Sequence, residues 1–194
     1  MREAKLARKT RETDIKLSLQ LDGKGQSSIS TGIGFFDHML TGFARHGLFN
    51  LDIKVEGDLQ VDGHHTVEDT GIVLGTAIKE AAGDKKGMQR YGYFILPMDD
   101  ALVLCSIDFS GRPYLNFEMD FPTEKCGYFE NELMKEFFYA ISYSAGMNIH
   151  IKKLAGENSH HIAEATFKAF AKALDMATRL DPRIEDVLST KGKL

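Results

Sequence analysis

Alternation of apolar and polar residues predicts strands in the first half of the chain, and helical spacing predicts helices. Apolar residues take every second position over 15–21 and again over 51–55, the pattern of a strand with one buried face. A further strand is expected to end near Ile33. Apolar residues at helical spacing predict helices over 35–45 and about 65–82.

The second half repeats this order of elements. Strands are expected over 101–109 and 114–121, followed by a helix over 132–144, a strand over 147–151 and a helix over 161–177. Each half therefore runs strand–strand–helix–strand–helix. Two such halves predict an α+β fold in which the helices pack on one face of each sheet.

The chain of 194 residues is long enough for one domain with a sizeable core. No Pro/Ser-rich linker or low-complexity tract divides it. We therefore expect a single domain over residues 1–194, built of two internal repeats over about 10–90 and 91–180, with a tail after them. Gene duplication is the simplest account of the repeats.

Composition narrows the class of protein. Hydrophobic residues make up 43% and charged residues 27%, as in ordinary globular proteins, which excludes a disordered tail, a fibre or a coiled coil. The net charge of −4 gives no electrostatic support for nucleic-acid binding. No apolar run approaches the roughly 18 residues that span a bilayer, and the first residues lack the apolar stretch of a signal peptide. With two cysteines and no disulfide framework, we expect a cytoplasmic protein that binds neither nucleic acid nor membranes.

The pattern H-H-x-x-E occurs twice, each time at the start of the last helix of a half. The motif residues are His64, His65 and Glu68 in the first half and His160, His161 and Glu164 in the second. Residues three or four apart share a face of a helix, so each glutamate can act beside its histidines. A lone histidine on a helix is more often a core or surface residue than a ligand. At this composition one such motif arises by chance with a probability on the order of 0.02, and two far less often, which favours metal binding.

The geometry of these motifs limits the kind of metal site. Adjacent histidines on a helix point about 100° apart, so they hardly chelate one ion together. Two ions per site, or sites shared between subunits, follow from that geometry. Imidazole and carboxylate ligands fit Mn, Fe, Zn or Ni, and the lack of thiolates argues against a closed structural zinc site. His38 and Glu136 add one ligand-capable residue on the equivalent earlier helix of each half.

Four long motifs resemble the imidazoleglycerol-phosphate dehydratase family in the same order along nearly the whole chain. They are FFDHML at 35–40, HHTVED at 64–69, SGRPYL at 110–115 and AGENSHH at 155–161. The resemblance implies a ribosomal S5 domain 2-like fold and an assembly of 24 subunits. It also implies a hydro-lyase of L-histidine biosynthesis that removes water from D-erythro-imidazole glycerol phosphate to give imidazole acetol phosphate. Two Mn²⁺ ions per active site would bind the imidazolate ring of the substrate.

The resemblance also assigns roles to residues, position by position. The implied metal ligands are His38, His64, His65, Glu68, Glu136, His160, His161 and Glu164. Many family members have histidine in place of Glu136, but a carboxylate oxygen can replace an imidazole nitrogen on manganese. The implied catalytic residues are Glu12, Glu68 and Glu164, with Glu12 as the acid/base group.

A phosphorylated substrate requires several cationic donors, arginine preferably. The residues that match substrate- and phosphate-binding positions of the family are Glu12, Arg90, Arg112, Lys168, Ser189, Thr190 and Lys191. Lys168 follows Glu164 by one helical turn and can therefore reach the same site. Without the resemblance, each of these residues would be interpreted as a solvated surface residue.

Two other functions compete with the dehydratase. Metals with a rim of arginine and lysine also suit a dinuclear metallohydrolase that cleaves a phosphate ester, although such sites are usually richer in aspartate. Released phosphate, rather than a ketone, would identify that activity. The other alternative is a metal-storage or metal-assembled shell protein without enzymatic activity.

Overall fold

The computed structural model describes residues 2–194, so residue 1 of the predicted domain lies outside the described residues. The first half consists of β1 (Glu3–Lys9), β2 (Thr13–Gln20), β3 (Ser27–Ser30), α1 (Gly34–Gly47), β4 (Asn50–Gly57) and α2 (His64–Ala82). The second half consists of β5 (Tyr91–Met98), β6 (Ala101–Asp108), β7 (Tyr114–Glu118), β8 (Lys125–Cys126), β9 (Phe129–Glu130), α3 (Leu133–Ala145), β10 (Asn148–Ala155) and α4 (Ser159–Thr178).

The predicted α+β fold with two similar halves is confirmed, but each half begins with one strand more than predicted. These extra strands are β1 and β5, which lie at the edge of their sheets. An edge strand has only one neighbour and is half covered, so its apolar pattern is weak. In β5, Tyr93, Phe94 and Ile95 are all exposed in succession, so no alternation is visible.

The two sheets have the same topology. The first has the strand order β1-β2-β4-β3 and the second β5-β6-β10-β7. In both sheets the first three strands are antiparallel to one another, and the last strand pairs in parallel with the third. The internal repeat therefore extends from the order of elements to the direction of every strand pair.

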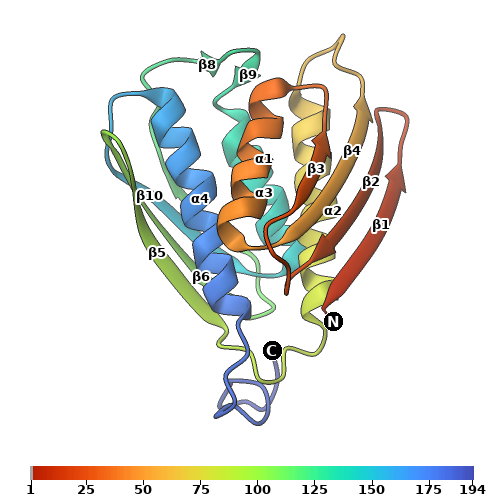
Figure 1. Cartoon of the computed structure of the whole chain (residues 1–194), viewed down its shortest axis with the longest axis vertical. Coiled ribbons are helices and arrows are strands. Elements are labelled where there is room, and N and C mark those ends of the chain that lie inside the picture. The colour runs from red at the N-terminus through yellow and green to blue at the C-terminus, as the bar shows by residue number, and fades with distance from the viewer. Residues whose placement is uncertain (1) are drawn as a thin grey trace.

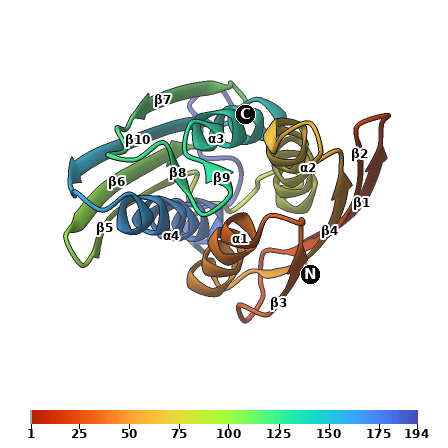
Figure 2. The same ribbon diagram turned by 90° about the horizontal axis from the view of Figure 1, so that it is seen from above.

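The four long helices lie between the two sheets, as Figure 2 shows, so one face of each sheet is buried against helices. Within this layer α1 packs against α4 and α2 packs against α3, so every helix contacts a helix of the other half. Aromatic rings join the halves: Phe36 and Phe137 are 5.2 Å apart between centroids, and Phe43 and Phe170 are 5.6 Å apart. Both halves therefore share one hydrophobic core.

Two glycines of α2 bring it close to α3. A Cβ atom at Gly71 would lie 2.7 Å from the carbonyl oxygen of Phe137, and one at Gly75 would lie 2.8 Å from that of Ile141. Neither separation is sterically tolerable, so the close approach of the two helices requires glycine. This contact sets where α3, with Glu136 on it, lies along the axis of α2.

Both motif-bearing helices begin at the same end of the molecule. In Figure 1 the first turns of α2 and α4 lie at the top, and the chain after α4 lies at the bottom. Within residues 2–194, the apolar length needed to cross a membrane is not reached by any helix.

Candidate active site

The second-half motif forms a cluster with a histidine of the first half. The α4 cluster consists of His38, His160, His161 and Glu164. Glu164 Oε2 lies 3.4 Å from His160 Nε2 and 3.8 Å from His38 Nε2. Among the described residues, His38, His160 and Glu164 form the one group of three or more potential ligands whose ligand atoms all lie within 4.8 Å of one another.

The fold assembles this cluster through a helix pair and a helix cap. His38 lies on α1, which packs against α4, so the cluster joins residues more than a hundred positions apart. The side chain of Asn158 caps α4 and accepts hydrogen bonds from the backbone N–H groups of His160 and His161, at 2.9 and 3.2 Å. Such a cap stabilises the first turn, where both histidines lie.

Two aspartates in the turn between β5 and β6 orient His161. Its Nδ1 lies 2.6 Å from Asp100 Oδ1, and its Nε2 lies 3.4 Å from Asp99 Oδ2. Asp100 also accepts hydrogen bonds from the backbone N–H groups of Glu157 and Asn158. These hydrogen bonds hold the pKa of Asp100 well below its usual value. The bond from Glu157 lowers it most, and the bond from His161 comes next. Asp100 is therefore an anionic acceptor that fixes the imidazole ring.

Lys168 is paired with Glu164, as the helical spacing predicts. Its Nζ lies 2.6 Å from Glu164 Oε1, and both side chains are 14% exposed. Burial works to raise the pKa of Glu164, but the hydrogen bond and charge of Lys168, with His38 and His160, lower it overall. Glu164 therefore stays ionised, with one oxygen facing Lys168 and the other facing the two histidines.

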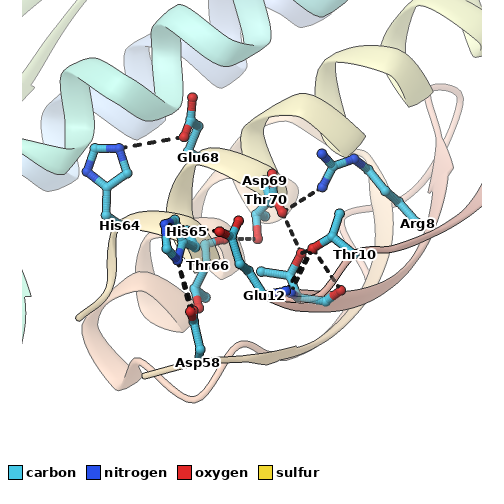
Figure 3. A network of polar contacts seen from close by, with 11 residues as sticks. Arg8, Thr10, Glu12, Asp58, His64, His65, Thr66, Glu68, Asp69 and Thr70 are labelled. Atoms are coloured by element: carbon cyan, nitrogen blue, oxygen red, sulfur yellow. Dashed lines mark hydrogen bonds and ion pairs between the residues drawn. The ribbon is translucent and has the colours of Figure 1, made fainter. Parts of the chain in front are cut away.

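The first-half motif lies in a second cluster, drawn in Figure 3. The α2 cluster consists of His64, His65, Glu68, Glu12 and Asp58. His64 Nε2 is 3.6 Å from Glu68 Oε2, and His65 Nε2 is 3.7 Å from Glu12 Oε1. Asp58 lies 3.0 Å from His65 Nδ1, and this hydrogen bond raises the pKa of His65. Glu12 reaches the cluster from the turn between β1 and β2.

The remaining predicted ligand, Glu136, lies on α3 without a polar partner for its side chain in residues 2–194. It precedes Ala140 by one turn on the side that packs against α2, because Ala140 lies against Gly71. Glu68 precedes Gly71 by about one turn in the same direction. Glu136 therefore lies on α3 at about the level of Glu68 on α2, but within residues 2–194 it makes no polar contact with the α2 cluster, whereas His38 belongs to the α4 cluster.

Arg90 and Arg112, predicted to bind phosphate, lie at the other end of the fold. Arg90 forms a two-point ion pair with Asp108, at 2.7 and 3.1 Å, and its Nη1 donates to the carbonyl of Leu188. Arg112 lies 4.0 Å from the same Asp108. The backbone N–H of Arg90 donates to the carbonyl of Ala177, at the far end of α4.

The helix rise of 1.5 Å per residue puts Ala177 about 25 Å from His160. Ser189, Thr190 and Lys191 follow Leu188 in the tail, which Arg90 holds at that same far end. One chain therefore brings Lys168 to the metal-ligand candidates but separates Arg90, Arg112 and the tail from them.

Sequence reasoning missed the three aspartates that hold the histidines, namely Asp58, Asp99 and Asp100. The available signal was an Asp-Asp pair between two strands, which becomes visible only when β5 is identified as a strand. Asp58 follows β4 directly and is separated from His65 by a turn, so its contact depends on the loop conformation.

The donor atoms of the α4 cluster fit a divalent transition metal. Imidazole nitrogen and carboxylate oxygen bind such ions at about 2.0–2.2 Å, which puts neighbouring ligand atoms about 3–3.5 Å apart. The observed separations of 3.4 and 3.8 Å are close to that range. Because Asp100 occupies Nδ1 of His161, Nε2 is the ring nitrogen left for a metal.

Two related halves, each with an H-H-x-x-E motif facing further imidazole and carboxylate groups, define an α+β enzyme scaffold with paired acid–histidine clusters. A sequence model described as imidazoleglycerol-phosphate dehydratase matches residues 31–174. The chain belongs to the imidazoleglycerol-phosphate dehydratase family, and it is a hydro-lyase of histidine biosynthesis.

Whole-chain relatives and solved structures agree with this family. The chain is 67% identical over 191 residues to imidazoleglycerol-phosphate dehydratase of Lachnoclostridium phytofermentans, covering 98% of this chain and 97% of the relative. It is 60% identical to that of Acetivibrio thermocellus, covering 100% and 99%. The crystal structure of the Staphylococcus aureus enzyme superposes with a TM-score of 0.84 at 40% identity, covering 92% of this chain and 99% of that one. The Pyrococcus furiosus enzyme gives the same TM-score and identity, covering 97% and 100%.

Proposed function

We propose that the protein removes water from D-erythro-imidazole glycerol phosphate and gives imidazole acetol phosphate. The observation that carries this proposal is the convergence of His38, His160 and Glu164 within 4.8 Å, beside the ammonium group of Lys168. Imidazole and carboxylate donors suit a metal-bound azole ring, and a neighbouring lysine suits a phosphorylated substrate.

We propose two Mn²⁺ ions per active site as the cofactor. Their ligands would be His38, His64, His65, Glu68, Glu136, His160, His161 and Glu164. When bound, the ions would supply Lewis acidity that stabilises the substrate ring as an imidazolate. Glu68 and Glu164 would contribute to catalysis as ligands of these ions.

The chain's own residues prepare the site. Asp100 and Asp58 each hold Nδ1 of a motif histidine, which leaves Nε2 as the ring nitrogen available to a metal. Nε2 of His161 lies 3.4 Å from Asp99, and Nε2 of His65 lies 3.7 Å from Glu12. Lys168 neutralises part of the charge of Glu164 and offers a cation to the substrate phosphate.

Glu12 is the proposed acid/base group. The carbon that loses its proton is not next to a carbonyl, so the imidazole ring must accept electron density during the reaction. A group must then protonate the departing hydroxyl and remove the carbon-bound proton. Glu12 suits this task because its side chain is 53% exposed and lies beside His65, and within residues 2–194 it forms no ion pair with a lysine or an arginine.

We propose that active sites are shared between chains in a homo-oligomer of 24 subunits. Support comes from the separation of Arg90, Arg112 and the tail from the clusters by the length of α4. A tail that holds Ser189, Thr190 and Lys191 could meet the metal ligands of another chain. The free thiols of Cys105 and Cys126 suit the reducing cytoplasm in which we expect the enzyme to work.

The test is product formation by metal-stripped protein before and after addition of Mn²⁺. Ketone formation from imidazole glycerol phosphate that returns only with Mn²⁺ would support the substrate, the reaction and the cofactor together. Release of inorganic phosphate instead would indicate a metallohydrolase. An intact assembly with bound metal but no product would indicate a storage or shell protein.

A further inference from the structure

We infer that Asp69 and Thr13 are positioning residues that hold Glu12 at the α2 cluster through a chain of hydrogen bonds that begins at a buried carboxylate. This inference rests on the proposed role of Glu12 as the acid/base group. Asp69 directly follows Glu68, so adjacent residues of α2 would serve the metal site and its acid/base group.

The chain of bonds begins at a buried carboxylate. Asp69 is 7% exposed and Thr13 is 3% exposed. Asp69 Oδ2 lies 2.6 Å from Arg8 Nη1 and 2.5 Å from Thr13 Oγ1. Figure 3 shows Asp69 on the far side of α2 from His64, turned toward Arg8. Arg8 and Thr13 lie on β1 and β2, so Asp69 ties α2 to both strands that carry the Glu12 turn.

The chain has a fixed donor direction. A carboxylate only accepts hydrogen bonds, so the hydroxyl of Thr13 donates to Asp69. Thr10 Oγ1, at 3.3 Å from Thr13 Oγ1, is then the donor of that pair. The same Thr10 oxygen accepts from the backbone N–H groups of Glu12 and Thr13, at 3.1 and 3.0 Å. The Thr10 hydroxyl also lies 3.5 Å from the backbone carbonyl oxygen of Thr13, a second acceptor for its proton. Both acceptors direct that proton toward Thr13, which leaves the lone pairs of Thr10 Oγ1 for the backbone of Glu12.

The Glu12 turn is held from the opposite side as well. Its carbonyl accepts from the backbone N–H of Asp58 at 3.1 Å, and the side chain of Asp58 holds His65. Glu12 and His65 are thus attached to one frame, which keeps Glu12 Oε1 at 3.7 Å from His65 Nε2. An exposed side chain at the tip of a hairpin would otherwise sample many positions, and loss of position lowers the rate rather than binding.

Thr13→Val tests the inference because it keeps the size of the side chain and removes the hydroxyl between Thr10 and Asp69. We expect kcat to fall about tenfold or more, KM to stay within about twofold, and the Mn²⁺ content per chain to stay unchanged. The Glu12 amide should exchange its proton faster, which hydrogen–deuterium exchange measures without substrate. Thr13→Ser should restore kcat and slow exchange.

Thr70→Val is the matched control. Thr70 is buried next to Asp69, but its hydroxyl donates, among residues 2–194, only to the carbonyl of Thr66 within α2, at 2.6 Å. This variant also loses one buried hydroxyl without touching the path to Glu12, so kcat and Glu12 exchange should stay unchanged. An equal loss of kcat in Thr70→Val and Thr13→Val would mean that buried hydroxyls act only through stability, and the inference would be wrong.

Glu12→Gln separates this inference from the proposed function. If Glu12→Gln keeps the wild-type rate, the role of Glu12 itself fails, whatever Thr13→Val does. If Glu12→Gln is inactive while Thr13→Val is fully active, only the positioning role fails. If both the role of Glu12 and the positioning role of Thr13 are right, adding Thr13→Val to Glu12→Gln should slow the reaction no further. Thr13 acts through the Glu12 carboxylate, which the Glu12→Gln variant already lacks.

Discussion

The α2 and α4 clusters carry the same motif on equivalent helices, yet their surroundings differ. The side chain of Glu164 is 14% exposed, and that of Glu68 is 41% exposed. One turn after each glutamate, the second half has Lys168 and the first half has Ile72. The α4 cluster is therefore a compact group with its own counter-cation, and the α2 cluster is more exposed and includes Glu12 in place of a lysine.

In each half, a hairpin turn brings a carboxylate close to Nε2 of a motif histidine. In the first half, the turn between β1 and β2 brings Glu12 to His65 Nε2; in the second, the turn between β5 and β6 brings Asp99 to His161 Nε2. Asp99 has a φ of 49°, whereas Glu12 is held by the Thr10 hydroxyl. The repeated topology therefore puts a carboxylate at the same place in both halves, and the two turns differ in backbone conformation and in side-chain hydrogen bonds.

The largest expected effect comes from removing the largely buried carboxylate of Glu164 in the α4 cluster. Glu164→Gln keeps the shape of the side chain but loses the charge that faces His38 and His160, so we expect activity to fall at least about a hundredfold. The Mn²⁺ content, measured by elemental analysis, should fall by about half because one of the two proposed ions would lose a ligand. Glu80→Gln, on the exposed side of α2, is the control. Full metal content and activity in Glu164→Gln would show that the α4 cluster is not a metal site.

Asp100→Asn removes the anionic partner of His161. We expect Mn²⁺ affinity to fall about 10–100-fold, the usual cost of losing a carboxylate that orients a metal-binding histidine. Asp58→Asn is the first-half counterpart, and its effect should be smaller because Asp58 holds His65 at 3.0 Å where Asp100 holds His161 at 2.6 Å. Metal titration calorimetry compares the two. A larger loss with Asp58→Asn would reverse the ranking of the two clusters.

Lys168→Ile gives the second half the residue that the first half has at this position. We expect KM to rise about tenfold, because the substrate phosphate loses a charged hydrogen-bond donor. Mn²⁺ should bind at least as tightly as before, since Glu164 Oε1 is released from its bond to lysine. Steady-state kinetics and metal titration measure the two effects separately. An unchanged KM would remove Lys168 from substrate binding.

The smallest effect is expected from Glu136→His, which gives α3 a histidine as α1 has His38. Activity should stay within about threefold, because imidazole nitrogen and carboxylate oxygen both bind manganese. Glu136→Ala, which offers no ligand atom, is the paired variant and should lose clearly more. Equal activity in both variants would contradict a ligand role for Glu136.

Most elements of the fold could be predicted from the sequence, because each depends on contacts close in the chain. The helix that begins at His64 and the strand that contains Ile15 have strong apolar periodicity and a buried face. The edge strand β5 could not be predicted from alternation, since its residues Tyr93 to Ile95 are exposed in succession. Missing β5 also hid the turn that holds Asp99 and Asp100.

The sequence by itself determined the duplicated halves and the H-H-x-x-E motifs, because helical spacing alone puts His160 and Glu164 on one face. Only the tertiary structure decided that His38 of the first half completes the second-half cluster, and that Arg90 lies a helix length away from it. It also decided that Asp69 turns from the metal-ligand face to hold the turn of Glu12. These relations arise from packing between distant segments, where burial and donor geometry select one partner among many residues of the same type.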